Sequence, residues 1–387
     1  MPKHAEQHFV PKFYLRNFSE DKKRLHLANI ARTKVILNAS LRKQCARTKF
    51  YDFAPDTESD LAKLEDRAAP IIRDIIRNDR FLQPDREYAR FVTLILFVVV
   101  QHLRGLRTAD ANDQMTDYYA KLMFVAEASE KTLDLSRVKI ENKFPAALPL
   151  NALPDVMPSA MRLRPHLMIN KSGVDFMTSD DPVLLHNQYC EGIDYQGVLG
   201  WNSKGVQVFI ALSPRHMLIL YDENIYRMGS RKNHLQTELT NPAEVDQFNA
   251  MQVMHAHENI YFCNPKDADR AHQFVVRYAK DRPKRPMTIV ESTINAQVDG
   301  TGKSLLHNFR PLLRQKLRVP AIRLQPGIDR VDLDSRGRLI GRPKSYWKKQ
   351  KGFERYEISR IIGAYDELEG PVMPETPRWN SDPSQSS

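Results

Sequence analysis

The stretch VQVFIALSPRHMLILY, residues Val206 to Tyr221, predicts the fold class. Two apolar runs rich in β-branched and aromatic residues flank Ser213-Pro214-Arg215, a pattern typical of a β-hairpin. Two shorter runs, 166–170 and 174–178, flank Lys171-Ser172-Gly173 in the same way. We therefore expect four strands in two tight hairpins, which together form a small antiparallel sheet.

Helices are predicted before and after these strands in the sequence. Residues 57–78 carry apolar side chains at helical spacing, with Pro70 expected to bend or divide the helix. Residues 85–107 form a second, nearly all-apolar and therefore central helix, and residues 110–132 a third. The Pro-dotted stretch 145–165 is expected to be a connector. Further helices are predicted at 242–258, capped by Asn241, and at 265–279, with an extended segment between them.

These elements predict an α+β fold. The helical N-terminal half, residues 1–150, would pack on a sheet-containing half, residues 160–280, with further C-terminal helices. Residues 281–370 would form a basic C-terminal extension, and residues 371–387, rich in Pro and Ser without apolar periodicity, a disordered tail.

The chain is basic, with 58 Lys and Arg against 47 Asp and Glu and a formal net charge of +11. Nineteen of these cations lie within residues 279–356. A localised excess favours an anionic partner, and nucleic acid is the first candidate. The alternative is an ordinary basic enzyme that never contacts DNA.

Cysteine usage and apolar runs predict a cytoplasmic protein without a membrane partner. The three cysteines lie far apart with no CxxC spacing, so neither disulfides nor a cysteine zinc site is expected. The apolar run Phe91–Val100 is too short to span a bilayer. P-loop, HExxH and GxSxG motifs are missing from the sequence, which argues against P-loop NTPases, zincins and serine hydrolases.

Two candidate sites stand in the first hundred residues. Gln7, His8 and Tyr14 are interleaved with Phe9, Phe13 and other aromatic residues, so they are expected to be buried and either partnered or poised for chemistry. The alternative is that His8 is a satisfied core residue that holds the N-terminus down. Glu65 precedes the small pair Ala68-Ala69 in a close-packed stretch, although an acid on a helix usually faces solvent.

Two further candidate sites follow buried segments. Gln101 and Arg104 are three residues apart at the end of the apolar helix, so they share a face of it. If Arg104 is buried it needs an anion, and the candidates are Glu65, Asp180 and a bound phosphate. A helix-dipole role explains Arg107 well. Ser179-Asp180-Asp181-Pro182 follows a strand, where Asp180 is either a ligand for a divalent metal or the cap of an Asp-Pro turn.

These blocks carry a resemblance to the bacterial family called domain of unknown function 4238. The chain is similar to that family at Gln7, His8, Pro11, Tyr14, Leu15 and Phe18, at Glu65, and at Ser179, Asp180 and Pro182. Asp181 sits at the variable position of the turn, so we assign it no role. The resemblance spans roughly residues 5 to 280 in four blocks and implies no activity.

One base, two acids, an amide and an arginine together suggest metal-assisted hydrolysis of a phosphodiester. In this hypothesis Glu65 and Asp180 hold Mg²⁺ or Mn²⁺, and His8 activates water or binds the metal. Arg104 stabilises the phosphate, and the binding residues are Gln7, Tyr14, Gln101, Arg104 and Ser179. The protein would be a nuclease, in defence or as a toxin. The alternatives are a non-enzymatic protein with a buried polar network that binds nucleic acid or another partner, and a small-ligand sensor.

Overall fold

The computed structural model describes residues 6–48, 50–51, 53–54, 56–127, 135, 137–191, 198–230, 235–293 and 304–328. The tail predicted for residues 371–387 and the basic residues from 329 to 356 therefore lie outside the described residues.

The largest sheet has five strands in the order β11 (Gln236–Leu239), β5 (Arg164–Asn170), β9 (His216–Tyr221), β8 (Gln207–Ser213) and β7 (Leu184–His186). The β8–β9 hairpin confirms the prediction from residues 206–221, with a register shift between Ala211 and Ser213. Its neighbours pair antiparallel, except that β11 runs parallel to β5. The fold is a mixed α+β fold.

The prediction of a second hairpin from residues 166–170 and 174–178 was wrong. The Asn170 side chain donates to the carbonyl oxygens of Val174 at 2.7 Å and Pro214 at 3.2 Å, which holds the segment after β5 as a loop. The chain then enters β6 (Thr178–Ser179), the edge strand of a different sheet. That four-stranded sheet has the order β3 (Lys34–Ser40), β2 (Arg24–Asn29), β12 (Asn259–Phe262), β6.

Strands also occur in the N-terminal half, which was predicted to be helical. Besides β2 and β3, β1 (Glu6–His8) pairs with β4 (Ala46–Thr48), and the short helix α1 (Lys12–Leu15) follows β1. Strand β2 is buried along most of its length and β3 is mostly exposed, so neither shows the alternation of a half-buried strand. Short 3-10 turns complete the described elements: η1 (Arg16–Phe18), η2 (Leu41–Lys43), η3 (Gln188–Cys190), η4 (Pro265–Asp267) and η5 (Ala279–Asp281).

The long helices lie close to where they were predicted. Helix α2 (Thr57–Asn78) has the predicted bounds and is not divided at Pro70. In place of helices at 85–107 and 110–132, α3 (Tyr88–Leu103) and α4 (Leu106–Glu127) meet at Arg104 and Gly105. A Cβ on Gly105 would lie 2.7 Å from Asp181 Oδ1, so a larger residue at this joint would displace the Asp181 side chain, which packs directly against it.

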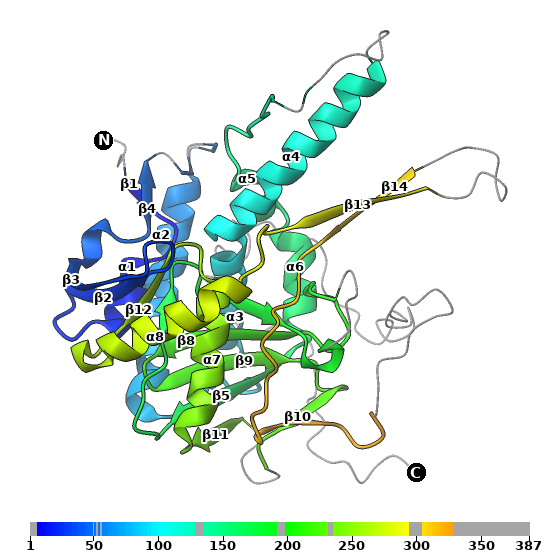
Figure 1. Ribbon diagram of the computed structural model, residues 1–387. Helices are drawn as coiled ribbons and strands as arrows, with labels where there is room; N and C mark the ends of the chain where they lie inside the picture. The colour runs from blue at the N-terminus through cyan, green and yellow to red at the C-terminus, as the bar shows by residue number, and fades with distance from the viewer. Residues whose placement is uncertain are drawn as a thin grey trace.

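The later helices agree with the predictions except in the connector. The connector at 145–165 contains α5 (Ala147–Asn151) and α6 (Leu153–Ala160), because Pro is tolerated in the first turn of a helix. Helix α7 (Pro242–His255) begins after Asn241, whose side chain accepts a hydrogen bond from the Ala243 amide at 3.0 Å, as predicted. Helix α8 (Ala268–Tyr278) follows. Figure 1 shows α7 in front of the five-stranded sheet and α3 behind it.

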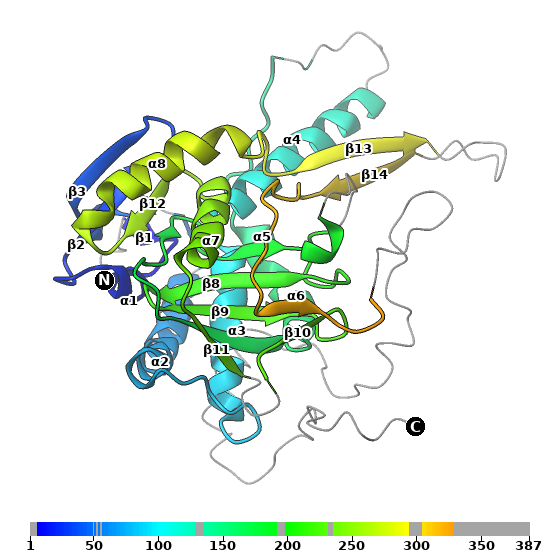
Figure 2. The same ribbon diagram turned by 60° about the horizontal axis from the view of Figure 1, so that its bottom comes forward.

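Part of the predicted extension packs into the same core as the rest of the chain. After the ribbon of β13 (Thr288–Thr293) and β14 (Ser304–Phe309), residues 310–321, here called the strap, run past α7 to β15 (Ile322–Leu324). Strand β15 pairs with β10 (Tyr226–Met228). Figure 2 shows this orange segment beside the five-stranded sheet. Leu313, Leu317 and Val319 of the strap are buried.

Within the described part of the chain, no single helix has the length and apolar composition needed to cross a membrane. Helix α3 and residues 106–125 of α4 pass that test only as a pair, which is bent by 49° at the joint between them.

Candidate functional site

Arg104 lies at the joint between α3 and α4, and its side chain is 1% exposed. Its Nη1 donates to Glu65 Oε1 at 2.8 Å and its Nε donates to Gln101 Oε1 at 3.0 Å. The Gln101 amide in turn donates to the Phe9 carbonyl at 2.9 Å. The prediction that Arg104 meets Glu65 or Asp180 is therefore confirmed, with Glu65 as the partner. Burial disfavours the charge, but Glu65 and Tyr51 together outweigh it and the pKa of Arg104 is raised.

Gln7 and His8 hold the N-terminal strand against neighbouring segments. The Gln7 side chain donates to Glu58 Oε2 at 3.0 Å and accepts from the Tyr51 amide at 2.5 Å. His8 Nε2 is 3.1 Å from the Arg42 carbonyl oxygen. Burial, with Lys12 nearby, lowers the pKa of His8, so the neutral imidazole is favoured.

Tyr14 and Ser179 join distant segments through buried hydroxyl groups. Tyr14 donates to the Ala211 carbonyl at 2.6 Å, and its hydroxyl is 2.7 Å from Thr178 Oγ1. Burial raises the pKa of Tyr14, so it stays protonated. Ser179 Oγ accepts from the Asp181 amide at 3.0 Å and from Gln252 Nε2 at 2.5 Å. Both hydroxyls thus have partners within the protein.

The Asp180 carboxylate caps the backbone that leads into β12. Oδ1 accepts from the His257 amide at 2.8 Å, and Oδ2 accepts from the amides of Glu258 at 2.7 Å and Asn259 at 2.9 Å. Burial raises the pKa of Asp180 to about 6, although the three amides oppose that rise. Asp180 therefore caps backbone amides, but these belong to the segment that leads into β12 and not to its own Asp-Pro turn.

The predicted site residues therefore form separate groups of contacts. Arg104, Glu65 and Gln101 are joined directly, whereas His8 contacts Arg42 and Asp180 contacts residues 257–259. Among the residues that the structure describes, no group of three or more His, Cys, Asp and Glu side chains is arranged to hold a metal ion. A metal held by Glu65, Asp180 and His8 stays a prediction.

A second group of polar side chains surrounds a cavity on the other side of the α3–α4 joint. The cavity has a volume of about 30 Å³, enough for a water molecule. Its polar lining residues are His102, Arg107, Thr108, Asp181, His255 and Arg310. Apolar walls come from leucines and from Pro283, Pro286 and Pro311. We call this the arginine pocket.

The arginine pocket carries more positive than negative charge. Arg310 Nη1 bonds to His102 Nε2, and Arg310 Nη2 donates to Thr108 Oγ1 at 3.3 Å. Arg107 makes no hydrogen bond or close ion pair within the described part of the chain. Burial lowers the pKa of Arg107, although Asp181, Asp110 and Asp180 oppose this shift. Burial and the charge of Arg107 lower the pKa of Arg310, although Asp181 opposes that shift. The pocket is therefore unfavourable for the two charges that it contains.

Asp181 is the negative group of this pocket. Its Oδ1 lies 3.6 Å from His255 Nε2, an electrostatic contact beyond hydrogen-bond length, and against Gly105. His102 is kept neutral, because burial and the neighbouring Arg310 place its pKa well below the ordinary value. A neutral imidazole can accept from the Arg310 guanidinium, which fixes Arg310 toward the cavity.

Sequence reasoning missed this pocket, although its residues lie beside those that were chosen. In Gln101-His102-Leu103-Arg104-Gly105-Leu106-Arg107, Gln101 and Arg104 face Glu65, while His102 and Arg107 line the arginine pocket. The break at Gly105 is the signal that could have separated the two faces. Because of this break Arg107 lies in the first turn of α4 and not at the end of a helix, so the helix-dipole role predicted for it was wrong. Asp181 was set aside as variable, and Arg310 lies in the extension.

Comparison with known families shows where the chain belongs. The family model described as protein of unknown function (DUF4238) matches residues 6–266, so the chain is a member of that family and the resemblance is confirmed. No curated protein and no solved structure matches the chain. The match ends before Arg310, so one arginine of the pocket comes from outside it.

Proposed function

We propose that this member of the family binds a phosphate group in the arginine pocket. The observation that carries the proposal is the placement of Arg107. Its guanidinium lines a cavity, lies mostly out of solvent and has no hydrogen-bonding partner among the described residues, while a second guanidinium, from Arg310, lines the same cavity. A buried guanidinium cannot lose its proton, so it needs an anion.

The charge balance of the pocket favours an anionic ligand. Arg107 and Arg310 repel each other, and Asp181 is the acid among the described lining residues. Asp110 and Asp180 also act on Arg107, but Asp110 is engaged with His257 and Asp180 with three backbone amides. A phosphate group between the guanidinium groups would form charge-assisted hydrogen bonds with both. Arg107 and Thr108 also stand in the first turn of α4, where the helix dipole and free amides attract negative charge.

The site residues predicted from the sequence around Arg104 hold the arginine pocket in position. The Arg104–Glu65 pair and the Gln101–Phe9 bond fix the α3–α4 joint from the side opposite the arginine pocket. Because Arg107 begins α4, the position of this joint decides where its guanidinium lies. The proposal therefore combines two hypotheses from the sequence analysis: a buried polar network that fixes the structure, and a site that binds a small ligand.

A metal-dependent nuclease is the enzymatic form of the same proposal. It would require Glu65 and Asp180 to exchange their present partners for Mg²⁺ or Mn²⁺, and for Asp180 those partners are three backbone amides. Incubation of labelled DNA and RNA with either metal, comparing wild type and His8→Ala, tests it. Our account expects binding without cleavage. Metal-dependent cleavage that His8→Ala abolishes would establish the nuclease instead.

Calorimetric titration with inorganic phosphate tests the binding proposal. Arg107→Met keeps the bulk of the side chain and removes its charge, so we expect at least a tenfold loss of affinity, about 1.4 kcal/mol. The matched control is Arg73→Met, since Arg73 is an exposed arginine within α2. Equal phosphate affinity in wild type and Arg107→Met, or no binding by wild type, would overturn the proposal.

Folding of the variant can be checked independently of binding. The lowered pKa of Arg107 means that its surroundings disfavour its charge, so Arg107→Met should be at least as stable as wild type without phosphate. Added phosphate should raise the melting temperature of wild type and of Arg73→Met, but not that of Arg107→Met.

A further inference from the structure

We infer that the phosphate recognised by the arginine pocket belongs to the backbone of a single-stranded nucleic acid. One phosphate enters the pocket, and its neighbours along the strand lie on two exposed basic segments beside it. This inference rests on the proposed function and deepens it, because it names the chemical class of the ligand. It is carried by the charges that flank the pocket, which the proposed function does not use.

The first basic segment runs from Ala279 to Met287. Pro283 and Pro286 line the arginine pocket, and the side chains of Lys280, Lys284 and Arg285 on the same segment are exposed. Arg282 holds the segment in place, since its Nη2 donates to the carbonyl oxygens of Ala256 at 2.5 Å and His257 at 2.7 Å. The exposed cations are therefore attached to a fixed wall of the pocket.

The second basic segment is the strap. Arg310, Pro311 and Leu313 line the arginine pocket, and the residues that follow alternate between buried and exposed positions. Leu313, Leu317 and Val319 are buried, and the exposed positions hold Arg314, Lys316 and Arg318. This alternation turns a row of cations toward solvent directly after the pocket.

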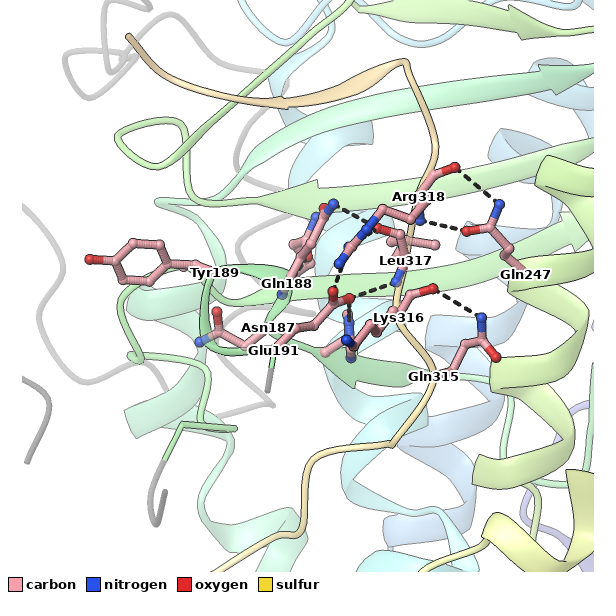
Figure 3. A network of polar contacts seen from close by, with 12 residues as sticks. Asn187, Gln188, Tyr189, Glu191, Gln247, Gln315, Lys316, Leu317 and Arg318 are labelled. Atoms are coloured by element: carbon pink, nitrogen blue, oxygen red, sulfur yellow. Dashed lines mark hydrogen bonds and ion pairs between the residues drawn. The ribbon is translucent and has the colours of Figure 1, made fainter. Parts of the chain in front are cut away.

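The strap is anchored by a buried acid, as Figure 3 shows. Glu191 accepts from the Leu317 amide at 2.6 Å and from Arg318 Nη1 at 2.6 Å, and its other contact is His186 Nε2 at 3.0 Å. Gln188 and Gln247 also bond to the backbone of the strap. Arg318 is thus engaged with Glu191, whereas Arg314 and Lys316 make no side-chain ion pair with the described residues. Because the backbone of the strap is already fixed, binding an anion would order only the side chains of these cations.

The spacing of these cations suits a polyanionic chain. Arg310 and Arg314 are four residues apart, so their backbones are separated by at most ~14 Å, a span that covers two or three phosphates of an extended strand. The pocket itself, at about 30 Å³, has no room for a base, so only the phosphate group of a nucleotide would meet its two arginines. Recognition would therefore follow the backbone and be independent of sequence.

The recessed position of Arg107 selects a flexible strand over a duplex. The guanidinium of Arg107 is recessed behind Pro283, Pro286 and Pro311. The nucleic-acid backbone must therefore bend locally for one of its phosphates to reach it. A single strand can bend locally, whereas the stiffness of a duplex opposes such a bend. Phosphates on both sides would then lie along the two exposed basic segments, in the manner of a charged groove that follows a single strand.

Fluorescence anisotropy with a labelled 12-nucleotide single strand, the matching duplex and a labelled mononucleotide tests the inference. We expect the single strand to bind at least tenfold more tightly than the mononucleotide or the duplex. Two double variants probe the segments: Lys284→Gln with Arg285→Gln, and Arg314→Gln with Lys316→Gln. Each should weaken strand binding roughly tenfold at low salt. Each should also reduce the slope of log affinity against log salt by about 1.4, since every phosphate that the protein neutralises adds about 0.7 to that slope.

Calorimetry with inorganic phosphate separates this inference from the proposed function. None of the four substituted side chains lines the pocket, so the phosphate affinity of both double variants should stay within threefold of wild type. Arg107→Met should lower the affinity for both inorganic phosphate and the single strand, and Arg73→Gln should change neither affinity.

Four outcomes decide between the two claims. Phosphate binding in wild type without tighter binding of the strand would overturn this inference and leave the proposed function standing. Equal or tighter binding of the duplex would overturn the single-strand assignment. Unchanged strand binding in both double variants would show that the two segments do not contact the strand. Strand binding that Arg107→Met leaves unchanged would show that the strand does not use the pocket and would overturn this inference, whereas the proposed function is decided by phosphate binding to the same variant.

Discussion

Replacing Arg104 with Met breaks the polar network at the α3–α4 joint. The guanidinium gives up hydrogen bonds to Glu65 Oε1 at 2.8 Å and to Gln101 Oε1 at 3.0 Å, while Met fills most of its volume. Removing one partner of a fully buried ion pair costs about 3–5 kcal/mol, chiefly because the other charge is left unpaired. The Glu65 side chain is 26% exposed and can regain part of its hydration, so we expect a smaller loss, about 2–3 kcal/mol.

Chemical and thermal unfolding measure this loss. A change of 2–3 kcal/mol corresponds to a fall in melting temperature of roughly 3–6 °C for a domain of this size. Arg73→Met is the matched control, since an exposed arginine within α2 should change stability by less than about 0.5 kcal/mol. Arg104→Met combined with Glu65→Gln removes the unpaired charge and should recover at least 1 kcal/mol of the loss.

The result also separates two roles for Arg104. A structural role predicts lost stability in Arg104→Met, whereas a role in holding a substrate predicts a variant that folds well and loses only binding. Full stability of Arg104→Met, together with no coupling to Glu65→Gln, would refute the reasoning from the buried pair.

Three further changes have definite expectations. Tyr14→Phe removes the hydroxyl that joins α1 to Ala211 and should lower the free energy of unfolding by about 1–2 kcal/mol; an unchanged denaturation midpoint would contradict that role. Between about pH 4 and pH 6 the Asp180 carboxyl keeps its proton in the folded protein and loses it in the unfolded chain. The free energy of unfolding should therefore fall by about 3 kcal/mol as pH rises through this window. Asp180→Asn should lose that component of the pH dependence. Glu191→Gln weakens the anchor of the strap, so hydrogen exchange at the Leu317 amide should accelerate at least tenfold, while amides of β9 keep their protection.

Elements with strong local signals were predicted well from the sequence. The β8–β9 hairpin has continuous apolar runs around a Pro-containing turn, and α2 and α7 carry helical spacing with an N-terminal signal at each start. These features depend on neighbours within a few residues. The strands from residue 24 to 48 were missed because they show little apolar alternation: β2 is buried along most of its length between β3 and the distant β12, and β3 is mostly exposed.

The candidate site was predicted in part. The buried Arg104 and its acid followed from a charge placed after an apolar run, and the structure confirms Glu65 as the partner. The arginine pocket could not be found in this way, because its residues come from α3, α4, the turn at Asp181, the end of α7 and the strap. Only the folded chain shows that Arg107 and Arg310, separated by 203 positions, line one cavity.

The most direct test of the arginine pocket is a crystal structure of the protein soaked with tungstate, a tetrahedral anion whose position the anomalous signal reveals. Our account predicts a peak in the cavity, with tungstate oxygens within hydrogen-bonding distance of both Arg107 and Arg310, and no such peak in crystals of Arg107→Met. A cavity without a peak in wild type, with Arg107 paired to Asp181 in its place, would contradict the claim that this pocket binds a phosphate group.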